Sequence, residues 1–212
     1  MRDTGFPAGE LLAWNSPARR VLPWRCEATT AWGLLLAEIM LKRELGERVV
    51  PVWQEAIAAY PTPSHMLSAN RSGLVGLLKP LGLQNQRAHA LKHISAILVR
   101  RYHGEVPDYQ ALLDIRWVGP YTAGAIEVFH RGGRVQLLDP NILRVGSRFF
   151  GIEAHRKSGP RIGELMLQSA PDGKVAEYYY AVLDLGALCC RRRPLCGACP
   201  ISESCAELQG AA

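Results

Sequence analysis

Four cysteines near the C-terminal end of the chain have the spacing of metal ligands. Cys189, Cys196, Cys199 and Cys205 follow one another as C-x6-C-x2-C-x5-C. Four thiolates so close in sequence can ligate a [4Fe–4S] cluster, with one sulfur for each iron. A structural zinc site also takes four cysteines, but zinc ribbons offer two close pairs, whereas this run has one. The spacing therefore favours an iron–sulfur cluster over zinc, with disulfides as the third alternative.

The two remaining cysteines have different expected roles. Cys190 could replace Cys189 as the first ligand, although the spacing from Cys189 is the better fit. Cys26 is isolated in the sequence, and we expect it to be a small buried apolar residue.

Positive charge accompanies the cysteines. The loop between the first two ligands holds Arg191, Arg192 and Arg193, and the whole chain of 212 residues carries a net charge of +6. Guanidinium groups held on a rigid loop suit phosphate oxygens, and a basic protein attracts polyanions such as nucleic acid. A solvated basic loop on an ordinary soluble enzyme is the alternative.

The N-terminal sequence shows no sign of export. "MRDTGFPAGELLAWNS" has neither the apolar core nor the small-residue cleavage site of a signal peptide. The uninterrupted apolar stretches are too short to cross a membrane. We therefore expect a cytoplasmic protein without membrane contact.

Two acidic residues stand out by their positions. Glu38 lies in "AWGLLLAEIMLKR" (31–43), a nearly all-apolar helix, where an acid is rarely buried without a partner or a function. Asp139 precedes Pro140 at an expected helix start, where capping of the helix is the ordinary explanation. Glu38 is interpreted as a functional group, with a buried cap or salt bridge as the alternative.

The elements that must position these residues are helices. Sustained strand-like alternation is missing, so an all-α fold is expected. Pro51 is predicted to begin one helix, and Ser72 and Asp108 to cap two others. The expected helices cover residues 31–43, 51–60, 73–79, 85–103, 109–113, 121–130, 141–150, 160–169 and 174–188.

"LLDIRWVGPYTAGAI" (112–126) predicts a short helix, a tight turn through Gly119, and a second helix that begins near Tyr121. A turn that leads into a helix presents unpaired backbone N–H groups, which favours an anion such as a DNA phosphate.

Together, the cysteine spacing, this hairpin, and an aspartate 18 residues after Tyr121 resemble the helix-hairpin-helix DNA glycosylases of the endonuclease III/MutY superfamily. The resemblance covers almost the whole chain. It implies two helical lobes with a C-terminal [4Fe–4S] cluster loop: a barrel domain at 27–132 and a cluster domain made of 1–26 and 133–212. The further similar segments are "LPWR" (22–25), "AEIMLKRE" (37–44), "LGLQNQRAHALK" (81–92) and "DLGALC" (184–189).

The residue at position 121 separates the branches of this family. The endonuclease III branch has a lysine there, which attacks the sugar and leads to strand cleavage. Tyr121 cannot form an imine, so the resemblance implies base removal without strong lyase activity. Tyrosine together with "LKRE" and "RFFG" looks most like the thymine–DNA mismatch glycosylases, which act on T·G and U·G pairs. An adenine glycosylase acting on A·G or A·oxidised-G pairs is the first alternative, and a non-catalytic iron–sulfur DNA-binding protein is the second.

The resemblance also implies roles for individual residues. Asp139 would stabilise the oxocarbenium-like state or activate water, Glu38 would contact the flipped base or position water, and Tyr121 would line the pocket. Arg43 and Leu83 would push into the vacated base stack. The other DNA-contacting residues would be Lys42, Gln84, Gly119, Asn141, Arg191, Arg192 and Arg193.

The expected partner is mismatched double-stranded DNA, bound by a monomer that is nucleoid-associated in a bacterium or archaeon. The hairpin departs from the family pattern Leu-Pro-Gly-Val-Gly, because Trp117 replaces a glycine and Pro120 follows Gly119. A positive φ at Trp117 would be costly, and Pro120 removes an N–H group.

Overall fold

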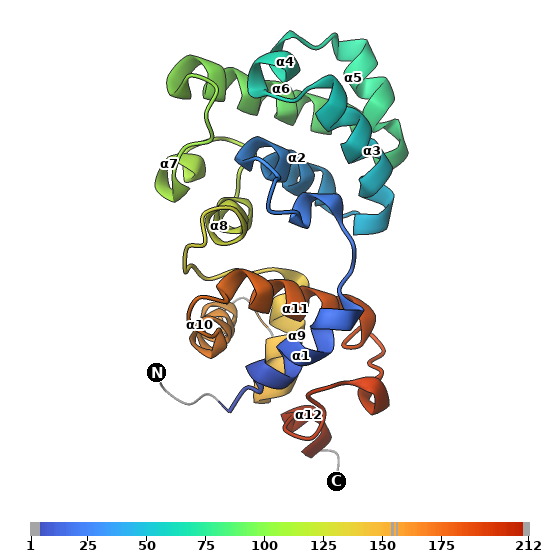
Figure 1. The fold of residues 1–212 in the computed structure, drawn as a ribbon, viewed down its shortest axis with the longest axis vertical. Helices are drawn as coiled ribbons and strands as arrows, with labels where there is room; N and C mark the ends of the chain where they lie inside the picture. The colour runs from blue at the N-terminus through green and yellow to red at the C-terminus, as the bar shows by residue number, and fades with distance from the viewer. Residues whose placement is uncertain (1–4, 154, 156, 210–212) are drawn as a thin grey trace. The chain divides into compact units, whose positions relative to one another are not determined.

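The computed structural model describes residues 5–153, 155 and 157–209, and these residues form helices and loops without any β-strand (Figure 1). The expected all-α fold is therefore confirmed. None of the described helices is long and apolar enough to span a membrane.

The chain forms two compact units. The central unit is Val21–Arg131, and the terminal unit combines Met1–Arg20 with Gly132–Ala212. The helices of the central unit are η1 (Pro23–Arg25), α2 (Ala31–Leu41), α3 (Gly46–Ala59), α4 (Pro63–Ser68), α5 (Arg71–Leu78), η2 (Lys79–Leu81), α6 (Gln84–Tyr102), α7 (Tyr109–Leu113) and α8 (Pro120–Phe129). Those of the terminal unit are α1 (Ala8–Ala18), α9 (Pro140–Phe150), α10 (Gly159–Ser169), α11 (Val175–Leu188), η3 (Cys196–Ala198) and α12 (Ala206–Gln209).

Helix α2 is the core of the central unit. It packs directly against α3, α6 and α8, and every residue from Trp32 to Met40 is buried. Thr30 begins the helix, because its side chain accepts a hydrogen bond from the backbone N–H of Gly33 at 3.1 Å. Burial of an apolar helix on all sides fixes its direction, so the loop at its C-terminal end has a defined position.

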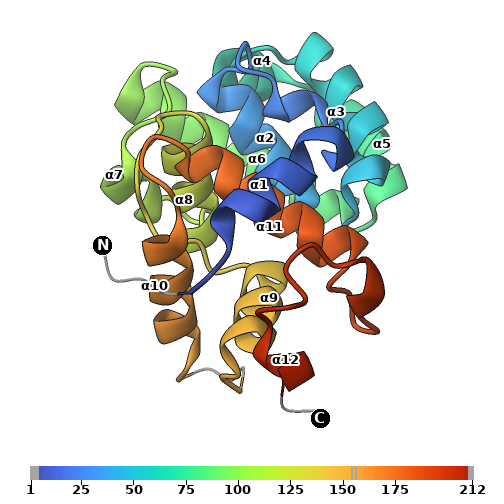
Figure 2. The same cartoon turned by 60° about the horizontal axis from the view of Figure 1, so that its bottom comes forward.

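The terminal unit is built around α9 and α11. Helix α11 packs against both α1 and α9, while α10 and α12 pack against α9 (Figure 2). The Phe6 and Phe149 rings lie 4.6 Å apart, centroid to centroid. Asp184 on α11 is fully buried and accepts hydrogen bonds from Asn15 at 3.1 Å and Arg20 at 2.7 Å. These contacts fasten the N-terminal helix to the unit that carries the cysteines.

Three local predictions are wrong. Helix α3 begins at Gly46, so Pro51 lies inside the helix, on its exposed face, and not at its start. The cap of α5 is Asn70, whose side-chain oxygen accepts from the N–H groups of Ser72 and Gly73. Cys26 is exposed, because it follows the short 3-10 turn at Pro23–Arg25 instead of entering a helix.

Candidate functional site

The cysteine-rich tail surrounds a hollow in the terminal unit. This hollow is partly open to solvent. Its walls are apolar, with contributions from Val145, Leu185 and Ile201. The thiols that line it belong to Cys189, Cys190, Cys196, Cys199 and Cys205. The four predicted ligands are therefore brought to one place, and Cys190 lies there with them.

The donor set of this hollow fits an iron–sulfur cluster. Among the described residues, no three Cys, His, Asp or Glu side chains converge on one point as ligands of a single metal ion. A [4Fe–4S] cube needs a thiolate at each of four separate irons, which suits sulfurs spread over a cavity wall. Burial raises the pKa of Cys199 to about 11, and burial likewise raises the pKa values of Cys189 and Cys205.

Two arginines of α9 hold the loop between the first two predicted ligands. Arg148 donates to the carbonyl oxygens of Arg191 at 2.6 Å and Arg192 at 3.2 Å. Arg144 donates to the carbonyl of Cys190 at 2.7 Å. The side chains of Arg191, Arg192 and Arg193 are exposed. The loop backbone is therefore fixed from α9, while the guanidinium triplet faces solvent.

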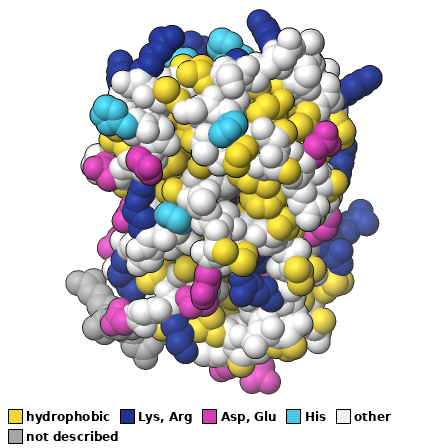
Figure 3. Space-filling view, turned by 45° about the horizontal axis from the view of Figure 1, so that its top comes forward, with side chains coloured by type: hydrophobic (Ala, Val, Ile, Leu, Met, Phe, Trp, Pro, Cys, Tyr) yellow, Lys and Arg dark blue, Asp and Glu magenta, His cyan; other side chains and the backbone are white. Residues whose placement is uncertain are grey.

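Sequence reasoning missed Arg144 and Arg148. The available signal was their spacing: residues four apart in "NILRVGSRFF" lie on one face of a helix. On the face shown in Figure 3, the Lys and Arg side chains lie mainly at the edges.

Asp139 caps helix α9. Its Oδ1 accepts hydrogen bonds from the N–H groups of Asn141 at 2.6 Å and Ile142 at 3.4 Å. The side chain is half-buried, and its Oδ2 has no hydrogen-bond partner among the described residues. Asn141 is held in turn by Arg144, which donates to its Oδ1 at 2.7 Å. One carboxylate oxygen thus fixes the orientation of the group and leaves the other available.

The segment that leads to Asp139 is also fastened. The N–H of Leu137 donates to the phenol oxygen of the buried Tyr179 at 3.4 Å. Arg134 donates to the carbonyls of Leu167 and Ala170 at 2.9 and 3.0 Å. The position of the aspartate therefore depends on α10 and α11 as well as on its own helix.

The central unit brings the other predicted residues to the end of α2. Glu38 is buried, with 6% of its surface exposed, as its apolar surroundings in the sequence indicate. Lys42 lies one turn further on and donates to the backbone carbonyl of Trp117 at 2.5 Å. Burial lowers the pKa of Lys42, and the nearby negative charge of Glu38 opposes this shift. Tyr121 lies in the first turn of α8, which packs against α2.

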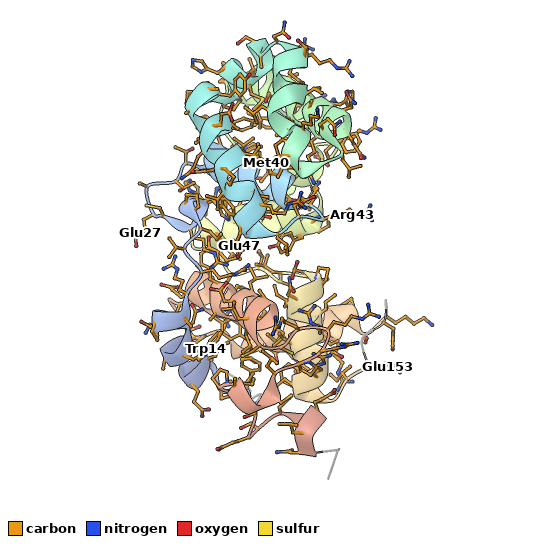
Figure 4. The ribbon with its side chains drawn as sticks, turned by 90° about the vertical axis from the view of Figure 1, so that its right-hand side faces the viewer. Trp14, Glu27, Met40, Arg43, Glu47 and Glu153 are labelled. Atoms are coloured by element: carbon orange, nitrogen blue, oxygen red, sulfur yellow. The ribbon has the colours of Figure 1, made fainter. Side chains whose placement is uncertain are left out.

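Two exposed residues flank this region with unusual backbone conformations. Arg43 has a φ of 64°, and Figure 4 shows its side chain directed outward, whereas Met40 points into the core. Leu83 has a φ of 46° and is 52% exposed. Gln84, half-buried, is the first residue of α6. Left-handed conformations at bulky residues are costly and mark positions that the surroundings determine. Arg87, which the sequence analysis did not identify, lies buried beneath both loops.

The hairpin keeps a left-handed residue where the family pattern has glycine. Trp117 has a φ of 79°, whereas Gly119 has a φ of −95° and directly precedes α8. The Trp117 ring packs edge-on against His89, with 5.9 Å between centroids, and Arg116 lies 5.0 Å from the ring centre. Pro120 is the first residue of α8, a position where a missing N–H costs no helical hydrogen bond.

The pattern of one protein family matches residues 36–170, a span that contains the second half of α2, the hairpin and Asp139. Its description is HhH-GPD superfamily base excision DNA repair protein. The chain belongs to the HhH-GPD superfamily.

Individual members of the HhH-GPD superfamily are similar over most of their length. The thymine/uracil-DNA glycosylase of Pyrobaculum aerophilum is 31% identical over 86% of this chain and 82% of its own length. The adenine DNA glycosylase of Mycolicibacterium smegmatis is 34% identical over 92% of this chain and 67% of its own length. Among solved structures, a thermostable thymine-DNA glycosylase superposes with a TM-score of 0.85 at 29% identity, over 96% of this chain and 95% of that one.

Proposed function

We propose that this HhH-GPD protein is a monofunctional DNA glycosylase that hydrolyses the N-glycosidic bond of thymine or uracil mispaired with guanine. The observation that carries the proposal is the carboxylate of Asp139, fixed through Oδ1 and open at Oδ2. The names of the Pyrobaculum relative and of the superposed structure support the choice of base.

The reaction breaks the bond between C1′ of the deoxyribose and the base nitrogen. The electron pair leaves with the base, positive charge develops on the sugar, and water adds to C1′. A carboxylate at this position stabilises the developing charge, or removes a proton from the attacking water. Asp139 supplies that group in our proposal, and Asn141 steadies it through the same helix end.

The central unit supplies the contacts to the extruded nucleotide in this proposal. A base inside a duplex cannot be attacked, and mismatched bases are the least costly to extrude. Arg43 and Leu83 enter the vacated stack, while Glu38 and Tyr121 contact the base. Tyr121 has no amine, so an imine with the sugar cannot form and the strand stays intact.

We also propose that Cys189, Cys196, Cys199 and Cys205 hold a [4Fe–4S] cluster, because their thiols line one apolar hollow. When bound, such a cluster cross-links the tail and keeps its loops in place. Its loop then carries Arg191, Arg192 and Arg193, which we propose to contact DNA phosphates.

A panel of duplexes tests the proposal. Purified protein is incubated with T·G, U·G, A·G and A·oxidised-G duplexes and with the matched pairs, and alkali then cleaves the strand at abasic sites. We expect alkali-dependent cleavage at T·G and U·G, and little cleavage before alkali. Binding without any abasic product would instead support a non-catalytic DNA-binding protein.

The second candidate function is removal of adenine. The 34% identity to the Mycolicibacterium adenine DNA glycosylase is the observation that favours it. Cleavage confined to the A·G and A·oxidised-G duplexes of the same panel would select this function.

A further inference from the structure

Arg87 occupies an unusual position in the central unit. It lies on the first turn of α6, and only 5% of its surface is exposed. Within the part of the chain that the structure describes, its side-chain nitrogens donate only to backbone carbonyl oxygens: those of Ile39 at 2.9 Å, Met40 at 2.8 Å, Lys42 at 2.8 Å, Leu81 at 3.5 Å and Gly82 at 3.1 Å.

These five carbonyls belong to two separate segments. Ile39 and Met40 lie in the last turn of α2, where carbonyls lack partners within the helix, and Lys42 follows directly. Leu81 and Gly82 form the turn that leads into α6. One planar guanidinium, whose donors point in fixed directions, therefore joins the end of α2 to the turn before α6.

Each joined segment ends in one of the left-handed residues. Arg43 directly follows Lys42, and Leu83 directly follows Gly82. Such a conformation is costly for a residue other than glycine, so it persists only where neighbouring contacts impose it. Arg87 therefore holds the residue directly before each left-handed residue, through hydrogen bonds to the carbonyls of Lys42 and Gly82.

The same arginine is connected to the hairpin through Lys42. The Lys42 carbonyl accepts from Arg87, while the Lys42 ammonium donates to the carbonyl of Trp117. Three segments distant in sequence, at 39–43, 81–83 and 117, are therefore linked through two side chains.

We propose that Arg87 is a positioning residue that sets Arg43 and Leu83 in the arrangement needed to push a base out of the duplex. This inference rests on the proposed glycosylase function, because it concerns the step before bond cleavage. Arg87 itself touches neither base nor sugar in this scheme.

The chain offers a matched control on the same helix. Among the described residues, Lys92 also donates only to backbone carbonyls, those of Leu67 in the last turn of α4 and of Ala69 directly after α4. Lys92→Met removes a cation and its carbonyl bonds from α6 without affecting the loops of Arg43 and Leu83. Any effect that comes only from lost stability should therefore appear in both the Lys92 and the Arg87 variants.

The test compares wild type, Arg87→Met, Arg87→Lys and Lys92→Met below the lowest of their melting temperatures. Base extrusion is followed by the fluorescence of 2-aminopurine placed beside a T·G pair, with a 2′-fluoro thymidine that resists cleavage. Base release is followed under single turnover with ordinary T·G duplex. For Arg87→Met we expect loss of the fluorescence rise and a fall in the single-turnover rate on the order of 100-fold, as misplacement by about 1 Å produces.

Lys92→Met should retain both signals even where its melting temperature falls as far as that of Arg87→Met. Arg87→Lys keeps the charge but not the planar guanidinium, so its fluorescence rise and its single-turnover rate should lie between those of wild type and Arg87→Met. If Arg87→Met does not fold, Arg87→Lys is the variant compared with Lys92→Met. Equal extrusion by the Arg87 variants and Lys92→Met would overturn the inference. Failure of the wild-type protein to extrude or release a base from any mispair would overturn the proposed function instead.

Discussion

The ammonium group of Lys42 donates a hydrogen bond to the backbone carbonyl of Trp117 across 2.5 Å, 75 residues away in sequence. The contact joins the loop after α2 to the turn of the hairpin. It also gives Lys42 a partner within the protein, although its sequence position indicates a DNA contact. We therefore expect two roles for exposed cations in this protein: Lys42 joins two loops, whereas the triplet at 191–193 contacts phosphate.

Salt dependence distinguishes these roles. Each phosphate neutralised by a side chain adds about 0.9 to the slope of log affinity against log salt concentration. Arg192→Met should lower this slope by roughly that amount. Lys42→Met should weaken binding equally at every salt concentration and leave the slope unchanged, because it loosens the hairpin. Fluorescence anisotropy with T·G duplex at four salt concentrations measures both, and a reduced slope for Lys42→Met would assign that ammonium to a phosphate.

Because the backbone of Trp117 is left-handed, we expect glycine to be more stable than alanine at this position, the reverse of the usual order in a helix. Glycine adopts a φ of 79° without strain, whereas alanine does not. The free energy of unfolding, measured by urea denaturation, should therefore be about 1 kcal/mol higher for Trp117→Gly than for Trp117→Ala. At the exposed helical position Gln54 the order should reverse, with alanine about 1 kcal/mol better than glycine. The same order at both positions would contradict the conformation of Trp117.

Two helix caps and one buried acidic residue could be predicted from the sequence. Asp108 caps α7 as expected, because a short acidic side chain reaches the backbone N–H three residues on. Asp139 likewise caps α9, and Glu38 is buried as its apolar neighbours indicate. These features depend on residues within one helix, and the sequence displays them directly.

Contacts between distant segments were not predictable in the same way. Arg87 looks like an ordinary polar residue of an amphipathic helix, and only the fold places five carbonyls around it. Cys26 is exposed because it follows a 3-10 turn, and no periodic pattern in the sequence predicts that turn. Conversely, the sequence shows that a left-handed Trp117 is costly, but only the contacts with Lys42 and His89 show how that conformation is supported.

Asp139→Asn separates the proposed chemistry from the capping role. Asparagine caps a helix about as well as aspartate, so the free energy of unfolding should change by less than about 0.5 kcal/mol. It carries no negative charge, so base release from T·G duplex should fall at least roughly 100-fold while DNA affinity is kept. Asp108→Asn, the same change at the cap of α7, should retain base release. A near-normal single-turnover rate for Asp139→Asn would remove this residue from the mechanism.

Serine substitutions identify the first ligand of the proposed cluster. The Cys189 side chain is directed toward the carbonyl of Ala198 at 3.3 Å, beside the turn that carries Cys196. The Cys190 sulfur instead accepts from Arg148 at 3.4 Å. Cys189→Ser should therefore lose iron and visible absorbance after anaerobic purification, whereas Cys190→Ser and the exposed Cys26→Ser should retain both. A colourless Cys190→Ser protein and a coloured Cys189→Ser protein would reverse the assignment.

Tyr179 makes the terminal unit sensitive to alkali. Burial raises its pKa from 10.0 to about 12, so the folded state favours the protonated phenol that accepts from Leu137. The stability from this group is complete below pH 10 and is lost as pH rises from 10 to 12, a total of roughly 3 kcal/mol for two pKa units. Tyr179→Phe should be less stable than wild type at pH 8, because Leu137 loses its acceptor, but it should lose less stability between pH 9 and pH 11.5. Urea unfolding followed by circular dichroism measures this difference, with Tyr109→Phe as the control. An identical alkaline decline in wild type and Tyr179→Phe would show that the phenol does not contribute.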